Sequence, residues 1–135
     1  MSDSRYVPRS FAVTPTEFGQ KSSIEWVPDA DLPNKELDWL RASQLQHGFA
    51  HQIRVAIGRN YQSVQEFADV NELDYRRLSR MLRGEAITRL EDVATIRRTL
   101  EVPVSCRFYS PTADVRLPKL EKDGSLKLFV LPKPV

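Results

Sequence analysis

The stretch 63–83 constrains the fold of this 135-residue chain more than any other segment. It begins with Ser63-Val64-Gln65-Glu66, a capping box in which the Ser and Glu side chains satisfy backbone donors at a helix start. Asp74 marks a second helix start, because its carboxylate accepts backbone N–H bonds and suits the helix dipole. The pattern predicts a short helix from residue 63, a turn at Asn71 or Glu72, and a second helix over 74–83.

The second of these helices has two chemically different faces. On a wheel at about 100° per residue, one side is apolar and the other is basic. The apolar side holds Leu78, Met81 and Leu82; the basic side holds Arg76, Ser79, Arg80 and Arg83, with Arg77 at the margin and Tyr75 near the N-terminal boundary. Charge runs are usually solvated surfaces, but solvated helices normally mix acids with bases. No acidic residue lies between Tyr75 and Gly84, which favours an anionic partner.

Further helices are expected on both sides of this pair. Residues 34–59 place apolar residues close to one helical face, with Asn34 as the expected N-cap and Gly58 near the C-terminal end. Gly48 weakens the middle, so one helix or two is compatible with the pattern. Downstream, Thr88-Arg89-Leu90-Glu91 is a second capping box. The helix that it opens is expected to bury Leu90, Val93, Ala94, Ile96 and Leu100.

His47 and His51 are four residues apart and can share one helix face. A metalloprotease helix needs glutamate directly after the first histidine, and Gly48 stands there instead. We therefore expect two exposed histidines and no metal site.

The two ends of the chain are expected to be extended. Four prolines exclude a long helix from the arm 1–33, where residues 6–13 and 22–27 are candidates for short strands. The aromatic residues of this arm indicate that it packs on something. Contact of Arg5 and Arg9 with a DNA minor groove is the alternative use of the arm.

The C-terminal segment 105–135 contains a hairpin signal at Asp123-Gly124, and Pro118 makes the partner strand an edge strand. A lone hairpin is marginal in water, so this one must dock. The N-terminal strands, the helical domain and a second subunit are candidate surfaces. We favour the N-terminal strands together with a dimer contact.

Composition narrows the class of protein. The net charge is only +2, but every Lys lies in the flanks, so the basic residues from Arg41 to Arg116 other than histidine are all Arg. Arg forks bind phosphates and guanine edges bidentately. The lone Cys106 excludes an internal disulfide and a cysteine-rich zinc site. We see no signal peptide and no membrane-length apolar run, so we expect a soluble, cytoplasmic protein.

The residues 53–104 resemble the lambda-repressor/Cro-like helix-turn-helix family, also called the XRE family. The resemblance is carried by Ser63 and Glu66, then Phe67-Ala68, Leu73-Asp74, Leu78, Gly84 and Leu100-Glu101-Val102. It implies a mainly α, lambda-repressor-like helical bundle over 34–104, between the extended arm and the C-terminal β-hairpin. The family often has Gly where Glu72 stands, so Asn71 is expected to adopt the left-handed conformation. Leu82 stands where many members have Glu, which makes Ile57 its expected apolar partner.

Roles follow from the resemblance and from the basic face together. The base-reading positions are Tyr75, Arg76, Ser79 and Arg80. The phosphate-contacting positions are Ser63, the backbone at Val64, Arg54, Arg77, Arg83, Thr88 and Arg89.

These expectations describe a sequence-specific regulator of transcription, repressor-like, that binds double-stranded DNA as a homodimer. The alternative is a protein-interaction module or antitoxin-type adaptor that uses the same fold to hold a protein partner. An enzyme is not expected, because the sequence offers no nucleophile–base pair, metal set or phosphate loop. No cofactor and no metal are expected.

Overall fold

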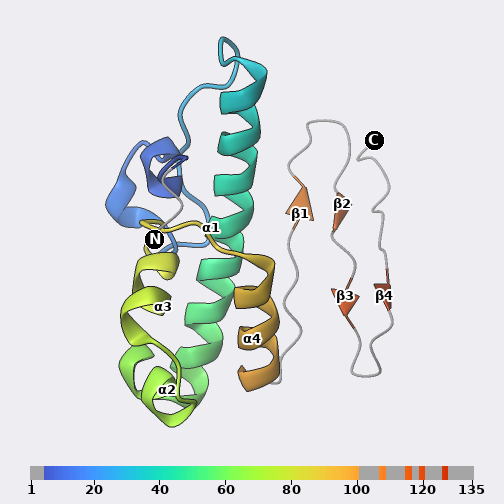
Figure 1. Ribbon diagram of the computed structural model, residues 1–135. Coiled ribbons are helices and arrows are strands. Elements are labelled where there is room, and N and C mark those ends of the chain that lie inside the picture. The colour runs from blue at the N-terminus through green and yellow to red at the C-terminus, as the bar shows by residue number, and fades with distance from the viewer. Residues whose placement is uncertain (1–4, 101–106, 109–114, 117–118, 121–125, 128–135) are drawn as a thin grey trace.

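The computed structural model describes residues 5–100 and four two-residue strands further on (Figure 1). Two 3-10 helices come first, η1 (Pro8–Phe11) and η2 (Pro15–Glu17). Four α-helices follow: α1 (Asn34–Asn60), α2 (Val64–Val70), α3 (Tyr75–Leu82) and α4 (Leu90–Leu100). The fold is mainly helical, as expected. In Figure 1, α1 is the long central helix, with α2 and α3 on one side and α4 on the other.

Helix α1 is a single helix of 27 residues, and Gly48 does not interrupt it. The expected N-cap was wrong: Asn34 is already helical, because the Pro33 carbonyl accepts the Leu37 N–H at 2.9 Å. Gly58 likewise remains inside the helix. The Tyr61 N–H donates to the Ile57 carbonyl at 2.8 Å, and the chain becomes extended only at Tyr61.

The start of α2 is capped as the sequence predicts. The Glu66 N–H donates to Ser63 Oγ at 3.0 Å, and the Glu66 carboxylate accepts the Gln62 N–H at 2.6 Å. Asp74 caps α3 by accepting the Arg77 N–H at 3.2 Å. Both helix starts are thus set by residues that the sequence identifies.

The turn between α2 and α3 differs from the prediction in one residue. Glu72, not Asn71, has the left-handed conformation, with φ 57°. Asn71 ends α2 instead: its backbone N–H and its side-chain amide both donate to the Phe67 carbonyl, at 3.2 and 2.9 Å. Its φ is −99°, so the change of direction falls on the next residue.

Helices α1 to α4 and the N-terminal arm share one buried core. The predicted apolar side of α3 is confirmed, since Leu78, Met81 and Leu82 are all buried. Ile57 and Leu82 belong to the same core. The other members are Phe18, Ala50, Ile53, Phe67, Ala68, Ile96 and Leu100.

Helix α4 begins one residue later than the sequence suggests. The backbone N–H of Arg89, just before the helix, donates to the carboxylate of Asp92 at 2.8 Å, and not to that of Glu91. Burial of Leu90 was also wrong, because its side chain is 86% exposed, and Ala94 is exposed as well. At about 100° per residue, both point away from the side on which Ile96 is buried.

The expected N-terminal strands are not formed. Pro8 and Pro15 each begin a 3-10 helix, and proline favours such starts because its φ is preset. A single antiparallel bridge joins Ala12 to Trp26. The expectation that the arm packs is confirmed, since Phe18 is only 1% exposed.

Beyond α4, β1 (Arg107–Phe108) pairs antiparallel with β2 (Val115–Arg116). Likewise β3 (Lys119–Leu120) pairs antiparallel with β4 (Leu126–Lys127). The hairpin turn predicted at Asp123-Gly124 lies outside the described residues. In the part of the chain that is described, no helix has both the length and the apolar character needed to cross a membrane.

Candidate nucleic-acid interface

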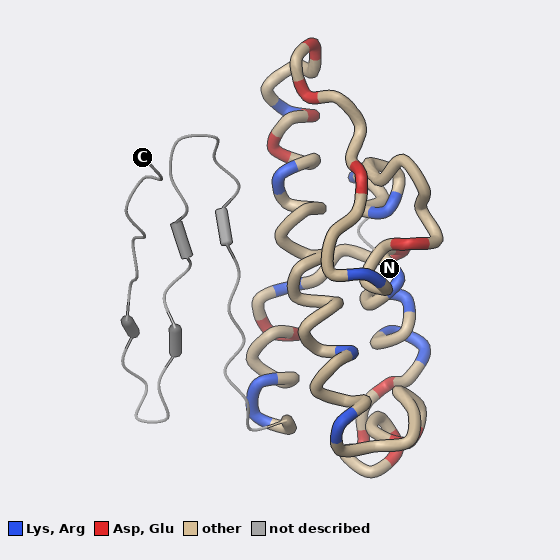
Figure 2. The backbone as a smooth tube through the Cα atoms, turned by 180° about the vertical axis from the view of Figure 1, so that it is seen from behind, with Lys and Arg blue, Asp and Glu red and all other residues tan. Residues whose placement is uncertain are grey.

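The basic face of α3 is turned away from the core. Arg76 and Arg83 are exposed, Tyr75 is 41% exposed, and Ser79 and Arg80 are half-buried. Figure 2 marks the Lys and Arg positions along the backbone in blue, those of this helix among them. Among the described residues, no acidic side chain pairs with Arg76 or Arg80. Within that part of the chain, nothing occupies either guanidinium group.

At the C-terminal end of α3, one carboxylate lies between two guanidinium groups. Glu85 Oε2 is 3.0 Å from Arg83 Nη2, and Glu85 Oε1 is 3.4 Å from Arg9 Nη2. The backbone N–H of Arg9 also donates to the Gly84 carbonyl at 2.9 Å. One negative charge shared by two positive charges leaves this end of the face positive.

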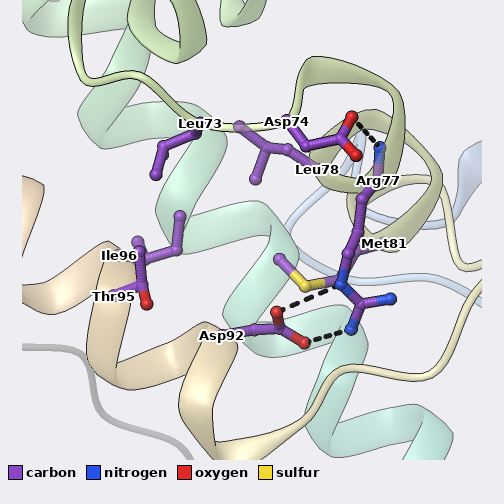
Figure 3. A pocket seen from close by; sticks show the side chains of 8 residues that line it. All are labelled: Leu73, Asp74, Arg77, Leu78, Met81, Asp92, Thr95 and Ile96. Carbon is purple, nitrogen blue, oxygen red and sulfur yellow. Dashed lines mark hydrogen bonds and ion pairs between the residues drawn. The ribbon is translucent and has the colours of Figure 1, made fainter.

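Arg77 has a different environment from the other arginines of α3. Its Nε and Nη2 donate to the two oxygens of Asp92 in α4, at 3.3 and 2.6 Å (Figure 3). Any phosphate that Arg77 contacts must compete with this carboxylate. The pair borders a pocket of about 100 Å³ between α3 and α4. The pocket is lined by Leu73, Asp74, Arg77, Leu78, Met81, Asp92, Thr95 and Ile96.

The other predicted phosphate contacts lie at the starts of α2 and α4. Ser63 is exposed and Val64 is half-buried at the start of α2. Before α4, Arg89 is exposed, but its N–H is used by Asp92. The N–H of Thr88 donates to Gln46 Oε1 at 2.9 Å. At Thr88, therefore, the side chain rather than the backbone N–H is available to a phosphate.

Gln46 is a buried positioning residue that sequence reasoning missed. It is buried in α1, and its amide nitrogen donates to the carbonyls of Met81 and Ala86, at 3.0 and 2.8 Å. Together with its bond to Thr88, it fixes the end of α3 and the loop that leads to α4. Its signal in the sequence was a polar residue four positions before Ala50, on the inward face of an amphipathic helix.

Arg54 reaches the same region from α1. Within the described residues its guanidinium has no hydrogen-bond partner, and its Nε atom is buried. Burial is the main cause that lowers the pKa of Arg54, and the positive charge of Arg83 adds to it. Tyr75 acts in the opposite direction. The charge of Arg54 therefore interacts electrostatically with Arg83 and Tyr75.

The expectation of two exposed histidines was wrong, because His51 is half-buried and His47 is buried. The Nδ1 of His47 accepts the Gly19 N–H at 2.9 Å, and the rings of Phe18 and Trp26 lie edge-on to it at 5.5 Å. Burial lowers its pKa, and the neighbouring His51 acts in the same direction. This histidine ties the N-terminal arm to α1.

The structure thus places Tyr75, Arg76, Ser79 and Arg80 on α3, with Arg83 directly after the helix and Arg54 of α1 near its C-terminal end. Ser63 and Arg89 stand at separate helix starts. No group of three or more His, Cys, Asp or Glu side chains suited to a metal occurs in the part of the chain that the structure describes. Comparison of the chain with models of protein families, with curated proteins and with solved structures finds no match.

Proposed function

We propose that this protein is a sequence-specific regulator of transcription, repressor-like, that binds double-stranded DNA. In this proposal α2, the turn at Glu72 and α3 form a helix-turn-helix, and α3 enters the major groove. The observation that carries the proposal is the pair Arg76 and Arg80 on α3. Both project from the side opposite the buried residues, and neither has an acidic partner among the described residues.

Base reading falls to the first two turns of α3. Arg76 and Arg80 present forks that match the O6 and N7 atoms of guanine, while Tyr75 and Ser79 add hydroxyl groups. Phosphate contacts fall to the flanks: Ser63 and Val64 at the start of α2, Arg83 at the end of α3, and Thr88 and Arg89 before α4. Arg77 instead holds α4 through Asp92.

The regulator acts as a homodimer in this proposal. Helix-turn-helix proteins usually read two half-sites about one helical turn apart, which requires two copies related by a two-fold axis. Catalysis has no part in the proposal.

Selection of bound duplexes from a random DNA pool tests the proposal. We expect enrichment of a palindrome with a guanine in each half-site. Repeating the selection with Arg80→Ala should blur the preference at one base pair of each half-site, whereas Arg98→Ala, an exposed arginine of α4, serves as the control. Absence of any enriched sequence from a folded sample would contradict the proposal.

The alternative is an interaction module or antitoxin-type adaptor. It is supported by two apolar side chains that the described residues leave uncovered, Leu90 at 86% exposure and Val70 at 63%. Single exposed apolar residues are common on protein surfaces, so this support is weaker than that for DNA. Purification of a stoichiometric protein partner, lost on Leu90→Ser, would favour the alternative.

A further inference from the structure

Among the described residues of α1, two buried side-chain nitrogens have no hydrogen-bond partner, Arg54 Nε and His47 Nε2, and Arg54 is the one of the two that is always protonated. Burying a charge is costly unless a counter-charge or hydrogen bonds compensate it. The buried Nε of Arg54 has neither among the described residues. Arg54 is half-buried, so an anion that contacts the rest of its guanidinium would offset the cost of the buried Nε.

Arg54 lies near the C-terminal end of α3. Gly19 packs between the end of α3 and Arg54: a methyl group on its Cα would lie 2.4 Å from the Leu82 carbonyl oxygen and 3.6 Å from Arg54 Nε. The Arg54 side chain therefore lies beside the last turn of α3. Arg83, the next residue after that turn, is exposed.

Arg54 of α1 thus lies close to the chain that leads into Arg83, and the carboxylate that pairs with Arg83, Glu85, also pairs with Arg9. Arg guanidinium groups bind phosphates through two parallel N–H bonds, and two such forks match the several oxygens of one phosphate.

We propose that Arg54 and Arg83 form a binding site for an oxyanion, occupied in function by one phosphate of a DNA backbone. The choice of DNA as the source of the phosphate rests on the proposed function, whereas the oxyanion site itself does not. Because Arg54 is anchored in the core helix and not on α3, this contact fixes the DNA relative to the whole domain. It carries no sequence information.

Inorganic phosphate tests the site without DNA. Thermal unfolding is measured in phosphate and in chloride at equal ionic strength for the wild-type protein, for Arg54→Met and for Arg98→Met. A ligand that binds only the folded state raises Tm. Phosphate also stabilises folded proteins in general, so we expect it to raise Tm more for the wild type and for Arg98→Met than for Arg54→Met.

The same variants separate a binding role from a structural one. In chloride, Arg54→Met should be at least as stable as the wild type, because an apolar side chain replaces an unsatisfied charge. Arg54→Lys keeps the charge without the fork and should retain only part of the phosphate effect. An equal rise of Tm in phosphate for Arg54→Met and the wild type would overturn the oxyanion site.

DNA titrations test the source of the phosphate. On every duplex, Arg54→Met should bind roughly tenfold to a hundredfold more weakly, as expected for loss of a charge-assisted contact. The slope of log K against log salt should become shallower by about 0.9. An unchanged slope would overturn the assignment to DNA. If the wild type shows the phosphate effect and binds no DNA, the oxyanion site stands and the proposed function fails.

Discussion

Arg77 of α3 and Asp92 of α4 are joined by two hydrogen bonds, and the same carboxylate accepts the N–H of Arg89. One acidic side chain therefore both fixes the angle between two helices and begins the second of them. Sequence reasoning assigned Arg77 to phosphate and did not pair it with Asp92. The helix that carries the proposed reading face is held in place by one of its own arginines.

Asp92→Ala should destabilise the fold by about 1–3 kcal/mol. The substitution removes the acceptor for the Arg89 N–H and leaves the half-buried guanidinium of Arg77 without its carboxylate. Urea unfolding monitored by circular dichroism measures the change. Glu91→Ala, at the exposed neighbouring position, is the control and should alter the free energy of unfolding by less than about 0.5 kcal/mol. Equal losses for the two variants would contradict the role given to Asp92.

Glu72→Gly should stabilise the protein by roughly 0.5–1 kcal/mol. A left-handed conformation costs a residue with a Cβ atom about 1–2 kcal/mol, and part of the gain is offset by the flexibility of glycine in the unfolded chain. Glu72→Ala keeps the Cβ atom and should give no gain. Comparison of the two in the same denaturation assay separates the backbone effect from loss of the carboxylate.

Gly84→Ala should cost about 2 kcal/mol or more. Its φ is 74°, and an added Cβ atom would lie 2.7 Å from the ring of Phe18. The left-handed backbone and the displaced aromatic ring both oppose the substitution. Gly48→Ala is the matched control, because a Cβ atom there meets nothing within 4 Å. Within a helix that change should stabilise, by up to about 1 kcal/mol.

The free energy of unfolding should fall as the pH drops through about 6.5, the ordinary pKa of histidine. Burial lowers the pKa of His47 in the folded protein, so the unfolded chain takes up the proton first. The loss should level off once the pH is below the folded pKa. Protonation also adds a proton to Nδ1, which accepts the Gly19 N–H.

Denaturation at pH 7.5 and at pH 5.5 measures this effect, the two values being chosen about one unit on either side of the ordinary histidine pKa. His47→Gln should remove most of the difference, and His51→Gln, on the same helix, should keep it. If only His51→Gln removes the difference, the titrating group is His51 and the role given to His47 is wrong.

Arg76→Ala and Arg80→Ala should each weaken DNA binding by about 1–3 kcal/mol and relax the preference at one base pair. Neither arginine has a protein partner among the described residues, so neither substitution should lower the free energy of unfolding appreciably. Fluorescence anisotropy with the selected duplex, alongside urea unfolding, reports both quantities. Unchanged affinity and preference in both variants would remove α3 from the proposed reading role.

Local signals predicted much of the helical part. Ser63, Glu66 and Asp74 act within three or four residues of themselves, so their capping roles can be predicted from sequence spacing alone. The buried side of α3 follows from the helical spacing of its apolar residues. Asn34 failed as a cap because the neighbouring Pro33 supplied the first carbonyl of the helix.

The missed features depend on residues far apart in the chain. His47 is buried by Phe18 and Trp26, which lie more than twenty residues earlier. Gln46 is satisfied by carbonyls near residue 81 and beyond. Spacing along one helix cannot show either contact, because both depend on how the arm and the loop before α4 fold back on α1.

The packing of Phe18 and Gly19 against the end of α3 also means that a fragment containing α3 must keep the N-terminal arm. A fragment that begins at Asn34 would keep all four α-helices. It would lack Phe18 and Gly19, which pack against Ala50, Leu82 and Gly84. A reporter or chimera that carries α3 should therefore also include residues 5–33. The junction with the host protein then lies outside the contacts that the arm makes with α1 and the end of α3.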